Sequence, residues 1–149
     1  MSLFKTRKLH LFLVFLQFGG IFFFLLTGHV LHQKIYSGLL LVLSVLLGIW
    51  AVLSMNRQTI TFLPDVRKNA SLTRVGPYRW IRHPMYTSVI FFLLALMLNY
   101  FTYMRLTVFL MVLSALYFKI RIEEKILLKK YPDYVSYMKF TWKVIPFLF

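Results

Sequence analysis

Residues 35–54 read IYSGLLLVLSVLLGIWAVLS, a stretch without a charged side chain. A helix crosses a hydrocarbon core about 30 Å thick with roughly 20 residues, so this stretch predicts a transmembrane span. Residues 9–31 form a second apolar stretch, and three basic residues precede it. It resembles a secretory signal only superficially, because no small-residue cleavage pattern follows. We therefore predict a retained first span.

The composition of the 149 residues supports a membrane location. Apolar residues make up 60% and aromatic residues 19%, whereas soluble domains contain roughly 45–50% apolar residues. Eighteen Lys and Arg residues against four Asp and Glu residues give a net charge of +14. This combination excludes a disordered chain, a soluble enzyme and a soluble nucleic-acid binder. The sequence has no cysteine, which excludes disulfides and thiolate chemistry.

The second half of the chain has shorter apolar stretches, at residues 86–98 and 106–120. Each reaches the length of a span when its aromatic ends lie in the headgroup layer, which favours a tight helical hairpin. We predict an all-α integral membrane protein with four transmembrane helices, the last two a hairpin, plus cytosolic interfacial helices at the C-terminus. Residues 1–149 form a single membrane domain in this prediction, with two spans in residues 1–54 and a core in residues 55–149.

The basic residues provide an independent test of this topology. Sixteen of the eighteen fall before the first span, between the second and third spans, or after the fourth. Only Lys34 and Arg105 fall in the two opposite connections. The positive-inside rule then predicts a multi-pass protein with both termini in the cytosol, in the inner membrane if the chain is bacterial. The acidic residues, and with them the expected chemistry, lie on the same side: Asp65, Glu123, Glu124 and Asp133.

Residues 76–86, GPYRWIRHPMY, form the densest polar segment. Proline disfavours a helical conformation in the residue before it, so His83 is expected to be extended and Pro84 to begin the third span. The N–H groups of the first helical turn would then face the interface beside the charges of Arg79 and Arg82. This arrangement predicts a site for a carboxylate or a phosphate. A competing interpretation is that both arginines reach lipid phosphates from within an aromatic belt.

Glu123 and Glu124 lie on the helix that continues the fourth span. On helical spacing, the neighbours of Glu124 are apolar except for Arg121, and a carboxylate in such surroundings is costly unless it is functional or ion-paired. Glu123 lies nearer Lys119 and could form an ordinary surface pair. The cluster at residues 76–86 thus attracts an anion, whereas Glu123 and Glu124 offer carboxylates. S-adenosyl-L-methionine would satisfy both, and so would a zwitterionic phospholipid headgroup.

The remaining histidines and glycines do not predict a site. His29 and His32 lie at i, i+3 spacing, but no acidic residue or further histidine lies on their side of the membrane, so no metal site is expected. No G-x-G-x-x-G turn occurs, which disfavours a soluble Rossmann-type methyltransferase.

The two polar clusters together resemble the isoprenylcysteine carboxyl methyltransferase family. The resemblance rests on residues 76–86, on the hydrophobic hairpin after them and on the Arg121-Ile122-Glu123-Glu124 motif, and it extends over residues 71–147. That family shares its membrane core with the phosphatidylethanolamine N-methyltransferases. The resemblance implies a helical membrane enzyme that binds S-adenosyl-L-methionine in a cytosol-facing pocket, with residues 55–149 as the methyltransferase core.

The resemblance and the charge pattern also give expected site residues. The residues expected to bind the cofactor are Leu72, Thr73, Tyr78, Arg82, His83, Pro84, Met85, Tyr86 and Glu124. The residues expected to be catalytic are Arg121, which matches a substrate-orienting arginine, Glu123 and Glu124.

The implied reaction transfers a methyl group to a lipidic or lipid-anchored acceptor, with O-methylation of a carboxylate favoured. The alternatives are N-methylation of a phospholipid headgroup and a non-catalytic membrane protein that keeps the fold. Membrane lipids and a lipophilic or lipidated substrate are the expected partners, and nucleic acid is not. The sequence leaves the oligomeric state open.

Overall fold

The computed structural model describes residues 3–28, 34–55 and 72–146, so the predictions for His29, His32 and Asp65 lie outside the described residues. The regular elements of this part are helices, and the only β pairing in it is an isolated bridge between Ile81 and Trp142. The elements in chain order are α1 (Leu3–Thr27), α2 (Ile35–Ser54), the 3-10 helix η1 (Gly76–Arg79), α3 (Pro84–Asn99), α4 (Tyr103–Lys130) and α5 (Tyr134–Lys139). The prediction of an all-α fold is confirmed for the described residues.

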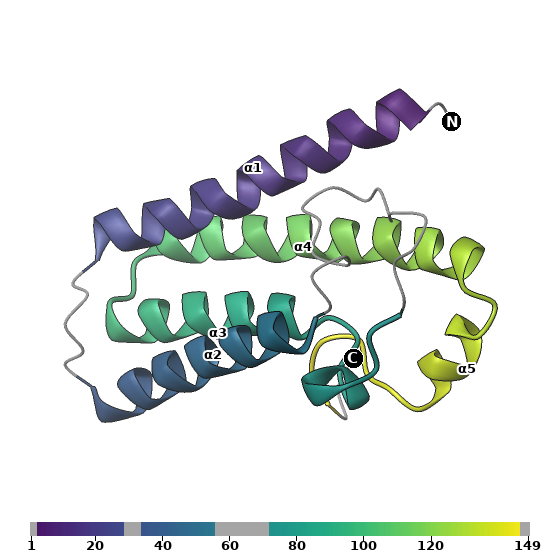
Figure 1. Cartoon of the computed structure of the whole chain (residues 1–149). Coiled ribbons are helices and arrows are strands. Elements are labelled where there is room, and N and C mark those ends of the chain that lie inside the picture. Colours follow the sequence, from purple (N-terminus) through teal and green to yellow (C-terminus); the bar gives the residue numbers. More distant parts are fainter. Residues whose placement is uncertain (1–2, 29–33, 56–71, 147–149) are drawn as a thin grey trace.

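The four long helices lie side by side (Figure 1). Helix α2 packs against α3 and α1 packs against α4, while α3 and α4 also contact each other. Helices α3 and α4 follow one another through residues 100–102 and run in opposite directions. Apolar side chains from α1, α3 and α4 fill the centre of the bundle, and its buried members include Phe24, Leu93, Leu96, Val112 and Leu116.

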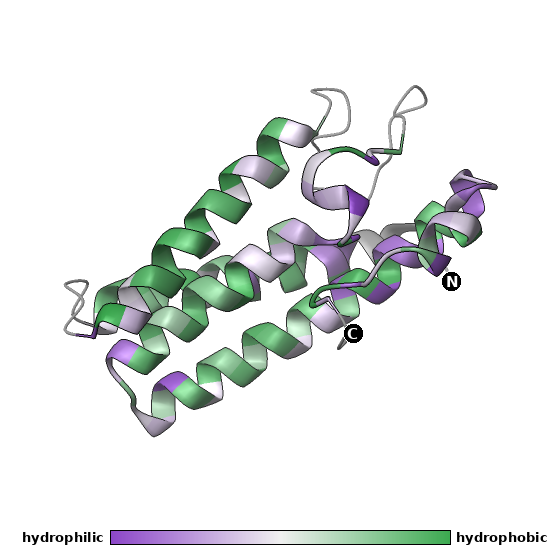
Figure 2. Ribbon diagram, turned by 90° about the horizontal axis from the view of Figure 1, so that it is seen from below, coloured by the Kyte–Doolittle hydropathy of each residue, from purple (hydrophilic) through white to green (hydrophobic). Residues whose placement is uncertain are grey.

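Among the described residues, two helices are long and apolar enough to cross a membrane, namely Lys8–Thr27 within α1 and Ile35–Ser54. Their outward faces carry exposed apolar side chains such as Phe15 and Leu53, which are 74% and 78% exposed. Figure 2 shows apolar residues along the long helices and polar residues gathered toward the end of the bundle that carries η1. A broad exposed apolar surface of this kind is typical of contact with lipid. The spans predicted within α3 and α4, and the cytosolic orientation, remain predictions.

At the end of the bundle away from η1, the guanidinium of Arg105 is buried, at 2% exposure. Nη1 donates to the carbonyl oxygens of Leu96 and Tyr100 at 2.8 and 2.9 Å, and Nη2 donates to the carbonyl of Phe24 at 2.6 Å. These carbonyls belong to the C-terminal turns of α1 and α3, where helices lack backbone donors and carry partial negative charge. The Arg105 side chain on α4 therefore holds the C-terminal ends of α1 and α3 together.

The segment that leads into α3 is held against the end of α2. Gly76 has a φ of +58°, and a Cβ at this position would collide with the side chain of Ser54 on α2. Glycine is needed there for both reasons, because it accepts a positive φ and has no side chain. The rings of Trp50 and Trp80 meet edge to face at 6.1 Å between centroids. Helix η1 is thereby placed just before the start of α3.

The C-terminal tail folds back onto this same segment. Its residues 141–144, which we call the C-terminal strap, run beside residues 80–83. The Trp142 carbonyl accepts from the Arg82 N–H at 2.8 Å, and the Trp142 N–H donates to the Trp80 carbonyl at 2.9 Å. The hydroxyl of Thr87 donates to the Val144 carbonyl at 2.6 Å. The sequence predicted interfacial C-terminal helices but not this pairing, which closes the tail over the first turn of α3.

Candidate active site

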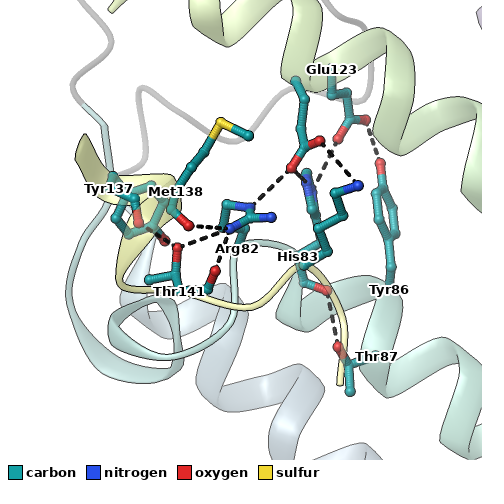
Figure 3. Close-up of polar contacts among 10 residues, drawn as sticks. Arg82, His83, Tyr86, Thr87, Glu123, Tyr137, Met138 and Thr141 are labelled. Carbon is teal, nitrogen blue, oxygen red and sulfur yellow. Dashed lines mark hydrogen bonds and ion pairs between the residues drawn. The ribbon is translucent and has the colours of Figure 1, made fainter. Parts of the chain in front are cut away.

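The two polar clusters of the sequence meet at the start of α3 and on the C-terminal third of α4 (Figure 3). Nε of Arg82 donates to Oε1 of Glu124 at 2.9 Å, and Nε2 of His83 lies 3.7 Å from the same oxygen. Nδ1 of His83 lies 3.7 Å from Oε2 of Glu123, and the Tyr86 hydroxyl donates to Oε1 of Glu123. We call these five residues the carboxylate cluster. The imidazole lies between its two carboxylates.

The backbone at the start of α3 explains how His83 reaches this position. Pro84 is the first helical residue, as the sequence predicted, but the φ and ψ of His83, −125° and 58°, are outside the helical region without being extended, so the prediction of an extended His83 is wrong. The His83 carbonyl accepts from the N–H groups of Tyr86 and Thr87 at 3.0 and 3.1 Å, and its own N–H donates to the Lys143 carbonyl. These N–H groups are therefore used within the protein. The prediction of an open anion site is wrong for the N–H groups of Tyr86 and Thr87, because the His83 carbonyl occupies them.

The side chain of Arg82 agrees with neither interpretation of the sequence, an open anion site or a contact with lipid phosphates. Its side chain is 6% exposed, and Nη1 donates to the carbonyl oxygens of Met138, at 3.1 Å, and of Thr141. A guanidinium bound to Glu124 and to the tail does not extend to lipid phosphates, and it is not available as a free anion-binding group. Arg79 is exposed, as expected of an interfacial arginine. Arg82 acts on this site through Glu124.

The buried Glu124 carboxylate remains ionised below neutral pH. Burial raises its pKa, but the electrostatic effect of the neighbouring His83 and Arg82 side chains and the hydrogen bond from Arg82 outweigh burial and lower the pKa below its ordinary value of 4.5. A carboxyl group with a lowered pKa stabilises the fold above its unfolded pKa, and it loses this contribution as the pH falls through the folded value.

This shift predicts how stability depends on pH. At neutral pH, the wild type should unfold at a higher temperature than Glu124→Gln, and the difference should stay constant down to about pH 4.5 and then shrink. Thermal unfolding of both proteins in the same detergent across a pH series measures this difference in unfolding temperature. If the difference is already lost above about pH 4.5, the pKa of Glu124 is not lowered.

Arg121 lies outside the carboxylate cluster. The sequence placed it beside Glu124 by helical spacing, but it is exposed and its Nη2 donates to the Tyr117 hydroxyl at 2.7 Å. The guanidinium that meets Glu124 comes from Arg82, so the expectation of an Arg121–Glu124 contact is wrong. Side chains of helical residues lean toward the N-terminus, and here that direction takes Arg121 to the residue one turn earlier.

The other predicted residues differ in their burial. Leu72, Thr73 and Met85 are half-buried, while Pro84 and Tyr78 are buried. The Tyr78 carbonyl accepts from the Tyr137 hydroxyl at 2.5 Å. Burial, followed by the charges of Tyr137 and Glu123, raises the pKa of the Tyr78 hydroxyl well above its ordinary value. The described residues include no group of three or more His, Asp or Glu side chains that could hold a metal ion.

Sequence reasoning missed the tail residues that complete the site. Thr141 and Met138 supply carbonyl oxygens to Arg82, and Nζ of Lys143 lies 4.0 Å from Oε2 of Glu124. The only available signal was the i, i+3 spacing of Tyr134 and Tyr137, which puts both rings on one face of a helix. Both rings are buried, and they anchor α5 beside the cluster.

These two tyrosines form a matched pair for a stability test. Tyr137→Phe removes the hydrogen bond to the buried Tyr78 carbonyl and should lower stability by about 1 kcal/mol. The Tyr134 hydroxyl is buried without a hydrogen-bond partner among the described residues, so Tyr134→Phe should leave stability unchanged or raise it by up to about 1–3 kcal/mol. Thermal unfolding of the two variants measures the contrast, and equal losses would contradict the assigned hydrogen bond.

A family model described as phospholipid methyltransferase matches residues 32–134. The matched residues include α2, η1, α3 and α4 and all five residues of the carboxylate cluster, whereas α1 and the C-terminal strap lie outside them. A comparison with curated proteins finds no match.

Proposed function

The chain belongs to the phospholipid methyltransferase family, and from this premise we propose that it transfers a methyl group from S-adenosyl-L-methionine to an amine on a lipid headgroup. The observation that carries the choice of acceptor is the pair of carboxylates around His83. Glu124 is bound to Arg82. The side chain of Glu123 is 26% exposed, and its partners within the cluster are the Tyr86 hydroxyl and the His83 ring. A cationic headgroup is attracted to such a carboxylate, whereas a carboxylate acceptor is repelled by it.

The residues present fit the polar groups of S-adenosyl-L-methionine. This cofactor carries an ammonium, a carboxylate and a sulfonium, and the site offers both signs of charge through Glu123, Glu124 and Lys143. Nε2 of His83 and the hydroxyl of Tyr134 are buried without a hydrogen-bond partner among the described residues. Such atoms destabilise a protein by about 1–3 kcal/mol each unless water or a ligand binds them. Their presence beside Glu124 supports a bound polar molecule at this place.

We propose that the cofactor is held by the residues that surround the start of α3. They are Leu72, Thr73, Tyr78, Arg82, His83, Pro84, Met85, Tyr86 and Glu124. Within this set, Arg82 keeps Glu124 ionised and fixed. When bound, S-adenosyl-L-methionine supplies a methyl group on a positively charged sulfur, which an aligned nucleophile displaces directly.

The protein contributes alignment and a proton acceptor. A headgroup amine is protonated near neutral pH and must lose a proton before it can act as a nucleophile. Glu123 accepts that proton, while the Tyr86 hydroxyl and His83 hold its two oxygens in place. The apolar faces of the helices admit the lipid tails, so partition into the membrane supplies most of the acceptor's affinity.

The proposed location follows from the distribution of charge. Sixteen of the eighteen basic residues are expected on one side of the membrane, and the carboxylate cluster lies with them. We therefore place the site and both termini on the cytosolic side of a multi-pass protein. Membrane lipids are then both its surroundings and its acceptors.

The decisive experiment follows a labelled methyl group in reconstituted protein. Phosphatidylethanolamine should gain label, and an isoprenylcysteine analogue should not. Label in the isoprenylcysteine carboxylate alone would instead support O-methylation, the reaction that the sequence favoured. Label in neither acceptor, although the cofactor binds, would refute both reactions.

A single acid substitution tests the role of Glu123. Glu123→Gln should lower the turnover of the amine acceptor about a hundredfold or more, because general-base catalysis usually contributes at least that factor. The matched control is Asp133→Asn, which changes an acid whose side chain is 83% exposed and which should leave turnover unchanged. Equal turnover in Glu123→Gln and the wild type would refute the assignment.

A further inference from the structure

The ammonium of Lys119 is buried in the bundle, although no step of the proposed reaction uses it. The residue is 6% exposed and lies on α4 one turn before Glu123. Its Nζ donates to Oε1 of Gln17 on α1 at 2.7 Å. The same Nζ lies 4.8 Å from the centre of the Tyr86 ring on α3. One cation therefore joins three helices beside the carboxylate cluster.

A charge in this place is not explained by stability. An amide oxygen and an aromatic face only partly offset the loss of water around an ammonium. A methionine would fill a similar volume without that cost, and replacement of buried charges by apolar groups is often neutral or stabilising. A charged residue within a membrane segment is by default a candidate for function, with its partner named. The partners of Lys119 are Gln17 and Tyr86, and the Glu123 carboxylate one turn along α4 also attracts the ammonium.

The contacts of Tyr86 show what Lys119 controls. One contact of its ring is with Lys119, and another is the stacked His83 ring, at 5.6 Å between centroids and 12° between planes. Its hydroxyl donates to the Glu123 carboxylate. The position of the ring thus sets the position of a carboxylate oxygen, and Lys119 is one of the groups that hold the ring.

We propose that Lys119 is a positioning residue: held by Gln17, it fixes Tyr86 and, through Tyr86, the Glu123 carboxylate. This inference rests on the proposed function, because it concerns the same transfer step. It also assigns a role to α1, which lies outside the residues matched by the family model. Through Gln17, this first helix becomes part of the catalytic unit.

The test compares Lys119→Met and Gln17→Leu with the wild type in reconstituted full-length protein. Lys119→Met should lower kcat about tenfold or more, because small displacements of reacting groups have effects of this size. The KM for phosphatidylethanolamine should change less than kcat, because Lys119 acts on the position of Tyr86 and Glu123 and is not itself one of the proposed binding residues. Lys119→Met alone leaves the buried Gln17 oxygen without its donor and should lower the unfolding temperature, whereas the double variant Lys119→Met, Gln17→Leu removes both partners and should restore it. A purely structural lysine would give the same stability pattern with kcat unchanged in all variants.

A double variant separates the two residues. Gln17→Leu should lower kcat in the wild-type background but not in the Lys119→Met background, because Gln17 acts only through the ammonium. Lys119→Arg, which keeps the charge, should recover part of the rate. Ser114→Ala changes an exposed hydroxyl of α4 that bonds its own helix and should behave as the wild type.

The outcomes distinguish this inference from the proposed function. A wild type that methylates phosphatidylethanolamine, with kcat unchanged in both Lys119→Met and Gln17→Leu, would overturn the role of Lys119 alone. A wild type that transfers label to neither acceptor would overturn the proposed function and this inference with it. If Lys119→Met does not fold, the rates of Gln17→Leu and Lys119→Arg decide, and wild-type rates in both would overturn the inference.

Discussion

Replacement of Glu124 by glutamine is expected to weaken the binding of S-adenosylhomocysteine at least about tenfold. It is also expected to lower the stability of the protein by about 3–5 kcal/mol, because it leaves the buried guanidinium of Arg82 without its counter-ion. The amide keeps the shape of the carboxylate, so the effect measures the charge. Calorimetric titration and thermal unfolding of the same detergent-solubilised sample give both quantities. His83→Ala is expected to weaken binding by a similar factor.

The partner substitution provides the control for this prediction. Arg82→Met alone should destabilise the fold, because Glu124 then has no guanidinium beside it. The double variant Arg82→Met, Glu124→Gln contains neither charge and should lose less stability than the sum of the single variants. It should still bind the cofactor poorly. Normal binding by Glu124→Gln would refute the proposed cofactor site, while additive losses would show that the two charges do not form a coupled pair.

Replacement of Arg105 by methionine is expected to be the most destabilising single change away from the site, at about 3–5 kcal/mol. It removes charged hydrogen bonds to the carbonyl oxygens of Phe24, Leu96 and Tyr100. Those oxygens end α1 and α3 and would lose their charged donor, although the Leu96 carbonyl would keep the N–H of Tyr100. A shift in the unfolding temperature measures the effect. Methyl transfer per folded molecule should not change, because Arg105 lies at the opposite end of the bundle from the carboxylate cluster.

Two arginine variants show whether the position, rather than the residue type, causes this loss. Arg121→Met changes an exposed guanidinium that binds only the Tyr117 hydroxyl among the contacts described here, and it should cost less than about 0.5 kcal/mol. Arg105→Lys keeps the charge but lacks the planar fork, so it should recover only part of the stability. If Arg105→Met lowers stability no more than Arg121→Met does, Arg105 does not hold the ends of α1 and α3 together.

The sequence by itself determined the local features of the protein. The uncharged run at residues 35–54 specifies a helix long enough to cross a membrane, because hydropathy and length act within one segment. The start of α3 at Pro84 follows from the proline ring, which restricts the residue before it and fits the first helical turn. The two polar clusters that supply the site were likewise visible as residue types at fixed spacings.

Only the tertiary structure decided which charges meet. Helical spacing pairs Glu124 with Arg121, but the packing of α3 against α4 and the return of the tail give it Arg82 instead. In the same way, burial of Arg105 and Lys119 depends on carbonyl and amide oxygens that α1 provides from more than eighty positions away. Such pairings depend on how separate helices are oriented, because the energy of a buried charge is set by its neighbours in space. The neighbours of a charged residue along the chain do not specify which charge it pairs with.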